Sequence, residues 1–271
     1  AGAERLVPLL EEEERQMADE VPDEIKHIET IEFEHVWFSY NNNDIYALED
    51  FTLNIKAGDF IGIVGPSGSG KSTLLSLLMG VYKPTRGAIY INGINIAKYD
   101  SSVLRHLMGY VFQQAYLFKG SIRDNLTLFD TSISNEEIVN AAKQVNLDAM
   151  IEQLPEGYDT PVGYLGSLLS DGQKQLLAFG RTLIKKTPIL LLDEATANID
   201  SHTEKQIQAS IESIRGSKTI VSIAHRLSTV EDANKIVYME YGKIIEKGSF
   251  DELINLKGAF YNLWNNQHSG S

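Results

Sequence analysis

The chain has 271 residues, 43% of them hydrophobic and 23% charged, a composition typical of a globular protein with one large domain or two small ones. Its formal net charge is −13, and no cluster of lysine and arginine offsets the acid, which argues against a nucleic-acid-binding surface. The sequence contains no run of eighteen apolar residues that would predict a membrane-spanning helix. It also contains no cysteine, which excludes disulfides and thiolate chemistry.

Both ends of the sequence suggest a piece of a longer protein. It begins Ala1-Gly2-Ala3 without methionine, and it ends His268-Ser269-Gly270-Ser271. Residues 1–27 are rich in acid, including Glu11-Glu12-Glu13-Glu14, and this composition favours a solvated linker helix over a binding site.

Sheet-like patterns begin after this linker. We expect strands at residues 31–38 and 51–55, separated by a turn at 41–44, and a fully buried strand at 60–64, where Phe-Ile-Gly-Ile-Val is apolar and short. After a helix at about 72–79, the sequence 88–91 followed by Asn92-Gly93 predicts a β-hairpin.

The segment between the strand at 60–64 and the next helix has the spacing of a phosphate-binding P-loop. It consists of Gly65, Pro66, Ser67, Gly68, Ser69, Gly70, Lys71 and Ser72, with Thr73 as the next residue of the helix. The glycines permit backbone angles that turn N–H groups around an anion, and the start of the helix adds partial positive charge. Lys71 is expected to reach the β- and γ-phosphates, and the Ser72 hydroxyl to bind Mg²⁺.

Residues 113–185 have mainly helical patterns. Ser134-Asn135-Glu136-Glu137 predicts a capping box, followed by an apolar face. Strands return at 189–192, 219–223 and 235–239, and Ser201-His202-Thr203-Glu204 is expected to cap a helix between the first two of them. The coarse architecture is an α/β core interrupted by a helical insertion.

Polar side chains follow two of these strands and a further expected strand at 110–112. Asp193 and Glu194 end the apolar strand at 189–192, His225 follows the strand at 219–223, and Gln113 follows Tyr110-Val111-Phe112. Because ligands bind at the carboxyl ends of parallel strands, we expect all four side chains near the P-loop. Asp193 would hold Mg²⁺ through a water, and Glu194 would act as general base on the attacking water. His225 would bind the γ-phosphate, and Gln113 would contact Mg²⁺ or the water.

The segment Leu169-Ser170-Asp171-Gly172-Gln173 resembles the L-S-G-G-Q signature of ABC transporter ATPases. The resemblance covers about residues 28–262, with the family's motifs in order: Tyr40 matches the aromatic that stacks on adenine, Gln113 the Q-loop, residues 197–200 the D-loop, and His225 the switch histidine. It implies a P-loop NTPase (RecA-like) core at 28–112 and 186–250, including an antiparallel β subdomain. It also implies a helical subdomain at 113–185 that carries the signature, and a C-terminal helix and tail at 251–271.

In this family two ATPase domains pack head to tail, and each signature closes over the ATP of its partner. The resemblance therefore implies that Ser170, Gly172, Gln173 and Asp200 contact nucleotide in such a dimer. Residues 120–126 and 224–229 resemble the exporter branch, which implies a missing N-terminal membrane domain and a location on the cytoplasmic face of the cell membrane.

Two residues depart from the family pattern. Asp171 replaces the first glycine of the signature: facing nucleotide it would weaken the site by charge repulsion, and facing solvent it would favour the start of the helix. Tyr164 stands where exporters commonly carry glutamate, in a segment that faces the membrane domain. An altered signature beside an intact Glu194 resembles one subunit of a heterodimeric exporter of drugs, lipids or peptides, and a homodimer that tolerates Asp171 is the alternative.

Other functions fit the sequence less well. ABC ATPases of DNA repair carry a long coiled coil between P-loop and signature, and ribosomal ones usually carry two cassettes, and this chain has neither. An ATP-dependent dimerisation switch with little turnover is the remaining alternative, and the presence of Glu194 argues against it. The expected function is an ATP-hydrolysing motor domain that drives export.

Overall fold

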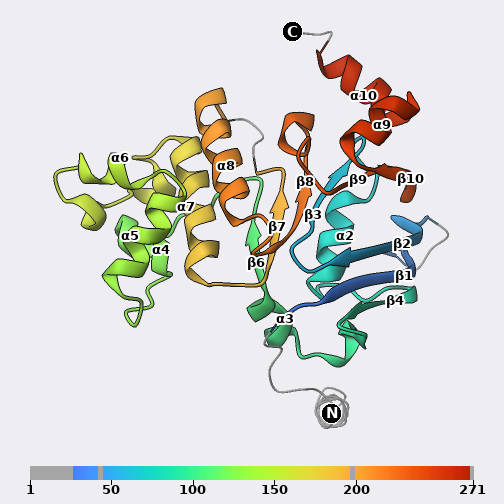
Figure 1. Ribbon diagram of the computed structural model, residues 1–271. Coiled ribbons are helices and arrows are strands. Elements are labelled where there is room, and N and C mark those ends of the chain that lie inside the picture. Colours follow the sequence, from blue (N-terminus) through green and yellow to red (C-terminus); the bar gives the residue numbers. More distant parts are fainter. Residues whose placement is uncertain (1–26, 42–44, 196–198, 269–271) are drawn as a thin grey trace, which may run out of the picture.

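A six-stranded sheet forms the centre of the molecule in the computed structural model, which describes residues 27–41, 45–195 and 199–268 (Figure 1). The strand order is β10-β9-β3-β8-β7-β6, and only the β9–β10 pair is antiparallel. The strands are β3 (Phe60–Val64), β6 (Met108–Val111), β7 (Ile189–Asp193), β8 (Thr219–Ile223), β9 (Lys235–Glu240) and β10 (Lys243–Gly248). The predicted strands are confirmed, and β10 extends the sheet by one strand that the sequence pattern did not predict.

The central strands are apolar on both faces because each face is covered. In β3, Phe60 and Val64 belong to one hydrophobic cluster, whereas Ile61 and Ile63 belong to the other. Side chains alternate between the faces of a strand, so this buried strand carries an unbroken apolar run.

One face of the sheet is covered by α2 (Lys71–Leu78) and by a second, antiparallel sheet of order β2-β1-β4-β5. Its strands are β1 (Thr30–Phe38), β2 (Leu48–Lys56), β4 (Arg86–Ile91) and β5 (Ile94–Asn95). The predicted hairpin joins β4 to β5 through Asn92 and Gly93, whose φ angles of 53° and 75° are those of a tight hairpin turn. The expected antiparallel β subdomain is therefore present.

The helical part lies on the other side of the sheet, at the left of Figure 1. It contains α4 (Ile122–Thr127), α5 (Asn135–Gln144), α6 (Asp148–Glu152) and α7 (Asp171–Ile184). The predicted capping box at Ser134 and Glu137 is confirmed. Shorter elements connect these parts: α3 (Ser101–Leu107) and the 3-10 turns η2 (Ile96–Lys98), η3 (Gly157–Asp159), η4 (Tyr164–Gly166) and η5 (Leu227–Thr229).

The helix α8 (Ser201–Ile214) begins one residue earlier than the sequence pattern predicted. Its N-cap is Asp200, whose carboxylate accepts hydrogen bonds from the backbone N–H groups of His202 and Thr203. The prediction that Ser201 begins a capping box is wrong, because a carboxylate at the N-cap binds two free N–H groups and also favours the positive end of the helix.

The C-terminal region forms two helices, α9 (Phe250–Leu256) and α10 (Ala259–His268), in place of the single helix that was expected. Lys257 ends α9 in the left-handed conformation, with φ at 54°, and so turns the chain into α10. The predicted acidic linker, apart from His27, lies outside the described residues. Within the part of the chain that is described, no helix is long and apolar enough to cross a membrane.

Candidate nucleotide site

Loops at the carboxyl ends of four parallel strands meet at one edge of the central sheet. The backbone N–H of Glu194, after β7, donates to the carbonyl of Ile223 at the end of β8 (3.0 Å). The N–H of Ala224, after β8, donates to the carbonyl of Ile63 in β3 (3.1 Å). These bonds bring the end of β7, and the His225 loop after β8, beside the end of β3, where the P-loop begins.

The predicted P-loop has the backbone conformation that its glycines permit. Gly65, Gly68 and Gly70 have φ angles of 145°, 78° and 99°. A Cβ atom at Gly65 would lie 2.1 Å from the carbonyl oxygen of Met239, and one at Gly70 would lie 2.4 Å from that of Ala47. Glycine is therefore required at both positions, by the close approach of backbone as well as by φ.

The Lys71 ammonium is drawn into this loop. Its Nζ donates to the carbonyl oxygens of Gly65 (2.9 Å) and Pro66 (2.7 Å), and the residue is buried. Burial lowers the pKa of Lys71, although the nearby carboxylates of Glu194 and Asp193 act in the opposite direction. The start of α2 thus holds a fixed positive charge beside loop N–H groups, an arrangement suited to an anion.

Glu194 lies between two of the other predicted catalytic side chains, His225 and Gln113. Its Oε1 is 2.5 Å from His225 Nε2, and its Oε2 accepts a hydrogen bond from Gln113 Nε2 (2.6 Å). Glu194 has a φ of 51°, an unusual conformation for a residue with a side chain and one that is common at active sites. The structure therefore brings together three residues that come from the ends of β6, β7 and β8.

Asp193 has a partner that the sequence analysis missed. The hydroxyl of Tyr110, on β6, donates a hydrogen bond to Asp193 Oδ2 (2.7 Å). Burial raises the pKa of Tyr110, and the bond to Asp193 raises it further, so the phenol stays neutral and donates. In the β6–β7 register Tyr110 pairs with Leu191, two residues before Asp193, and this register brings the Tyr110 and Asp193 side chains together. No motif in the sequence carries that information.

The donors predicted for a metal suit magnesium. Ser72, Gln113 and Asp193 offer hydroxyl, amide and carboxylate oxygens, and Mg²⁺ takes one or two such protein ligands together with phosphate oxygens and water. The described residues contain no group of three histidine or acidic side chains placed to hold a metal alone. This donor set fits a metal that arrives with a phosphate ligand.

The predicted adenine-stacking residue lies beside the P-loop helix. Tyr40 is 55% exposed, and its hydroxyl shares a hydrogen bond with Thr73 Oγ1 (2.8 Å). Edge contacts with Phe38 and Tyr82 hold its ring, at centroid distances of 4.9 and 5.4 Å. A rigid, exposed aromatic ring at this position can stack on a planar base.

The signature segment forms the start of α7, which begins at Asp171. Ser170 is the N-cap and forms a capping box with Gln173. The Asp171 side chain is 82% exposed and pairs with the Lys174 ammonium (2.9 Å). A Cβ at Gly172 would meet Thr203 Oγ1 at 2.6 Å, so the fold accepts a side chain at 171 but not at 172.

The D-loop is described only in part, because residues 196–198, and with them Ala197 and Asn198, lie outside the described residues. Asp200 caps α8, and its Oδ2 also accepts a hydrogen bond from the Thr203 hydroxyl (2.7 Å). The carboxylate of Asp200 is thus already engaged within its own chain.

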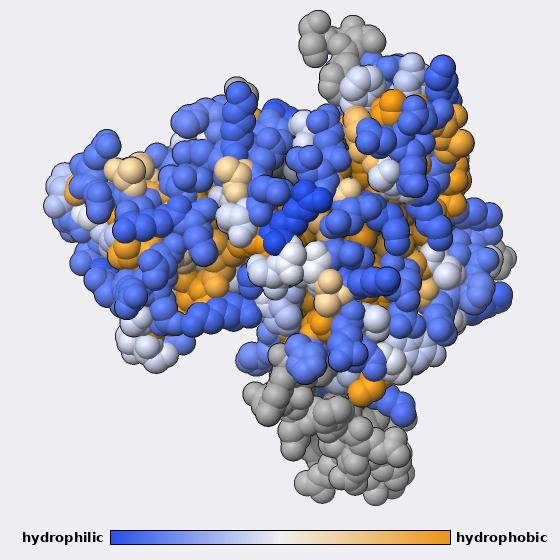
Figure 2. Space-filling model, viewed as in Figure 1, coloured by the Kyte–Doolittle hydropathy of each residue, from blue (hydrophilic) through white to orange (hydrophobic). Residues whose placement is uncertain are grey.

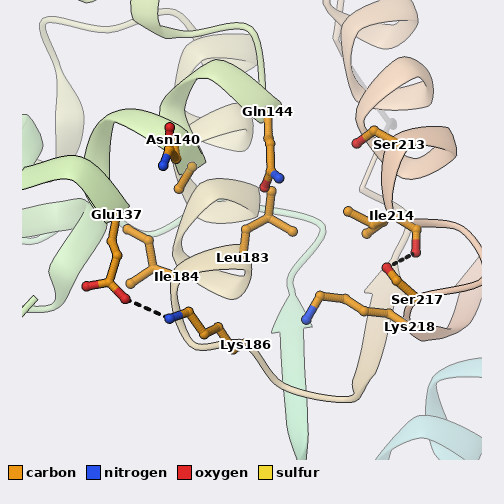
Figure 3. Close-up of a pocket in the computed structure, with 11 residues that line it drawn as sticks. Glu137, Asn140, Gln144, Leu183, Ile184, Lys186, Ser213, Ile214, Ser217 and Lys218 are labelled. Atoms are coloured by element: carbon orange, nitrogen blue, oxygen red, sulfur yellow. Dashed lines mark hydrogen bonds and ion pairs between the residues drawn. The ribbon is translucent and has the colours of Figure 1, made fainter. Parts of the chain in front are cut away.

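A cavity of about 400 Å³ lies between α5, α7 and the end of α8, away from the predicted nucleotide-site residues (Figure 3). Its lining includes Glu137, Lys186 and Lys218, and none of the predicted site residues. Lys218 precedes β8, whereas His225 follows it, so the cavity is at the opposite end of the sheet.

On the face in view, polar side chains dominate, with apolar side chains showing between the helical part and the sheet (Figure 2).

Comparisons with known proteins agree on one family. The ABC transporter family matches residues 48–197. The ATP-dependent lipid A-core flippase of Legionella pneumophila is 41% identical over 271 residues, which are 100% of this chain and 46% of that protein. A β-(1→2)glucan export ATP-binding/permease protein of Bartonella bacilliformis is 43% identical over 233 residues, which are 86% of this chain and 39% of that protein.

A solved structure gives the same result. A bacterial Atm1-family ABC exporter with ATP bound matches with a TM-score of 0.85 and 38% identity, over 92% of this chain and 44% of the exporter chain. The chain thus spans less than half the length of these relatives. With the fold and the ordered motifs, these matches show that the chain belongs to the ABC transporter family and is an ATP-binding domain of it.

Proposed function

We propose that this chain is the ATP-hydrolysing motor domain of an ABC exporter. The observation that carries the proposal is Glu194, held between His225 and Gln113 beside the Lys71 loop. A carboxylate at this place can take a proton from a water molecule that attacks the γ-phosphate. The relatives named for lipid A-core flipping and glucan export support a role in export.

Each residue contributes a separate part of the reaction. Loop N–H groups and Lys71 bind the phosphates, and the Tyr40 ring stacks on the base. When bound, Mg²⁺ would be held by Ser72, Asp193 and Gln113, and would neutralise phosphate charge. Glu194 accepts a proton from water while the water oxygen bonds to the γ-phosphorus. The bond between the γ-phosphorus and the oxygen of the β-phosphate breaks in the same step.

The functional unit that we propose is a head-to-tail dimer. In Figure 1, α7 and α2 stand on opposite sides of β7 and β8, so the signature at the start of α7 is separated from the P-loop of its own chain. Ser170, Gly172, Gln173 and Asp200 would then contact the nucleotide on the partner. Binding of ATP between the two surfaces would drive dimerisation.

The partner in this dimer is proposed to be a different ABC ATPase. The Asp171 carboxylate would stand at the partner's phosphate, where it disfavours anion binding. Its pairing with Lys174 offsets part of that charge and turns the side chain toward solvent, which supports the homodimer alternative.

A membrane domain is proposed as the second partner. The relatives are more than twice as long as the matched region, and their names describe a flippase and an export permease. Tyr164, Leu165 and Leu168 are 78%, 55% and 70% exposed, and exposed apolar side chains so close in sequence suit a protein contact. These residues would dock the cytoplasmic loops of the membrane domain, placing the chain on the cytoplasmic face.

Phosphate release from MgATP by the full 271-residue chain tests the proposal, with the Lys71→Met variant measured beside it. We expect steady hydrolysis by the parent chain and loss of both nucleotide binding and hydrolysis in the variant, because the ammonium within the loop is gone. Lys83→Met, an exposed lysine just after α2, is the matched control and is expected to behave as the parent. A parent chain that binds ATP and dimerises without turnover would instead indicate the switch function.

A further inference from the structure

The loop that carries His225 is bound from the C-terminal helix. The side-chain amide of Gln267, in α10, donates from Nε2 to the backbone carbonyl of His225 (2.6 Å). Its Oε1 accepts a hydrogen bond from the backbone N–H of Leu227 (3.1 Å). One side chain thus spans the loop on both sides of Arg226, across a sequence separation of about forty residues.

The helix α10 is anchored firmly enough to hold this loop. At its start, the Glu246 carboxylate accepts hydrogen bonds from the N–H groups of Ala259 (2.6 Å) and Phe260 (3.0 Å). Phe260 is fully buried, and its ring makes an edge contact with Phe250 of α9 at 6.0 Å. The N-terminal half of α10 therefore cannot shift without breaking a helix cap and exposing an aromatic core residue.

Gln267 lies on the same side of α10 as residues that pack against the core, while its own side chain is exposed. Phe260, Leu263 and Trp264 pack in or against the main core cluster, and Gln267 follows at the next position of the same helical face. From this position the exposed amide reaches the backbone of the His225 loop. In Figure 1, α10 lies at the end of the molecule toward which β7 and β8 run. His225 follows β8 in the chain.

The opposite side of the same loop is bound to α8. Arg226 forms an ion pair with Glu204, and the Ser228 hydroxyl donates to the second carboxylate oxygen of Glu204 (3.2 Å). The backbone around His225 is thus held from two sides, while the imidazole itself remains 50% exposed and directed at Glu194. The position of the ring depends on backbone that these two contacts fix.

We propose that Gln267 is a positioning residue for hydrolysis, and that α10 sets the place of the His225 ring relative to Glu194. This inference rests on the proposed function only for its kinetic consequence. The contact itself predicts a change in the environment of the His225 ring whether or not the chain turns over ATP.

The test uses the full chain with Gln267→Leu, which removes both hydrogen bonds at similar size. Ring ¹⁵N–¹H signals of His225, assigned by comparison with His225→Gln, are expected to shift or broaden. The kcat for ATP hydrolysis is expected to fall about tenfold, since two hydrogen bonds of ordinary strength position the loop, while KM changes less than about twofold. Gln267→Glu retains the acceptor for the Leu227 N–H but sets a carboxylate against the His225 carbonyl. Its kcat is expected to lie between those of the parent chain and Gln267→Leu.

Asn266→Leu, at the neighbouring exposed position of α10, is the matched control and is expected to leave the His225 signals and kcat unchanged. An unmoved His225 signal in Gln267→Leu would overturn the proposal, with or without a lower kcat. If the parent chain does not hydrolyse ATP, the proposed function fails, and the His225 signal still decides the role of Gln267. Should Gln267→Leu unfold, the same signal in Gln267→Glu decides it.

Discussion

The Tyr110 hydroxyl donates a hydrogen bond of 2.7 Å to the carboxylate of Asp193 across the β6–β7 pair. The neutral phenol engages one oxygen of the carboxylate and orients the group, which leaves the other oxygen available to bind a ligand. Asp193 is the acidic residue predicted to hold Mg²⁺, so we expect Tyr110 to influence metal binding through Asp193.

The Tyr110→Phe variant tests this relationship. The magnesium concentration that gives half-maximal hydrolysis is expected to rise about three- to tenfold, because a hydrogen bond to a charged group contributes about 1.5–3 kcal/mol and part of it is regained from water. The affinity for Mn²⁺ in the presence of ATP, followed by electron paramagnetic resonance, should fall in parallel. Tyr116→Phe, an exposed tyrosine nearby, is the control, and an unchanged metal requirement in Tyr110→Phe would show that Asp193 needs no such support.

The close approach of α7 to α8 predicts different outcomes for neighbouring positions of the signature. Gly172→Ala should lower the free energy of unfolding by about 1–3 kcal/mol, because its Cβ would meet Thr203 at 2.6 Å and the helices must move apart. Asp171→Ala should have little effect, since a Cβ is already present there. Denaturant unfolding measures both, and equal stabilities for the two variants would contradict the packing described here.

Charge repulsion at the signature separates the two proposed dimers. If the partner is a different ATPase, Asp171→Gly should raise the hydrolysis rate of this chain alone several-fold, because the repulsive carboxylate is removed. Lys174→Met should lower that rate, since it leaves Asp171 without its counter-charge. Rates that stay within about twofold of the parent in both variants would favour the homodimer, because an exposed ion pair usually contributes little free energy.

The contact between α5 and the end of α7 predicts a pH-dependent contribution to stability (Figure 3). The hydrogen bond from Lys186, together with those from Ser134, lowers the pKa of Glu137 to about 2. A lowered carboxyl pKa adds stability that is complete above the ordinary pKa of glutamate and is lost as the pH falls toward about 2. Glu137→Gln should therefore lower the melting temperature at pH 7, and this difference should vanish near pH 2.

The neighbouring Glu136→Gln variant is the control for this effect, because it removes a charge from the same first turn of α5 without the contact to Lys186. A melting-temperature difference for Glu137→Gln that persists unchanged at pH 2 would mean that the carboxylate charge is not its cause.

The motifs of the nucleotide site could be predicted because their geometry is local or follows from a parallel sheet. The turn from β3 into α2 requires glycine where the backbone of Met239 and Ala47 approaches, and the spacing of Gly65 and Gly70 reflects this. Glu194 and His225 come from adjacent parallel strands, whose carboxyl ends must lie side by side.

Other features depend on contacts that leave no pattern in the sequence. The start of α8 at Asp200 was missed by one residue because Ser201 and Asp200 are both good N-caps, and only the hydrogen bonds to His202 and Thr203 distinguish them. Tyr110 was missed because its partner is set by strand register. Gln267 was missed because its partners, His225 and Leu227, lie far away in the sequence.

The most direct test of the central claim is the effect of Glu194→Gln on the two halves of the reaction, measured on the same protein. Phosphate release should fall at least about a hundredfold, because the amide cannot take a proton from water. ATP-dependent dimers, followed by light scattering, should persist or accumulate, because Lys71 and the P-loop still bind nucleotide. Hydrolysis at the parent rate in this variant would contradict the account by removing Glu194 from the role of general base.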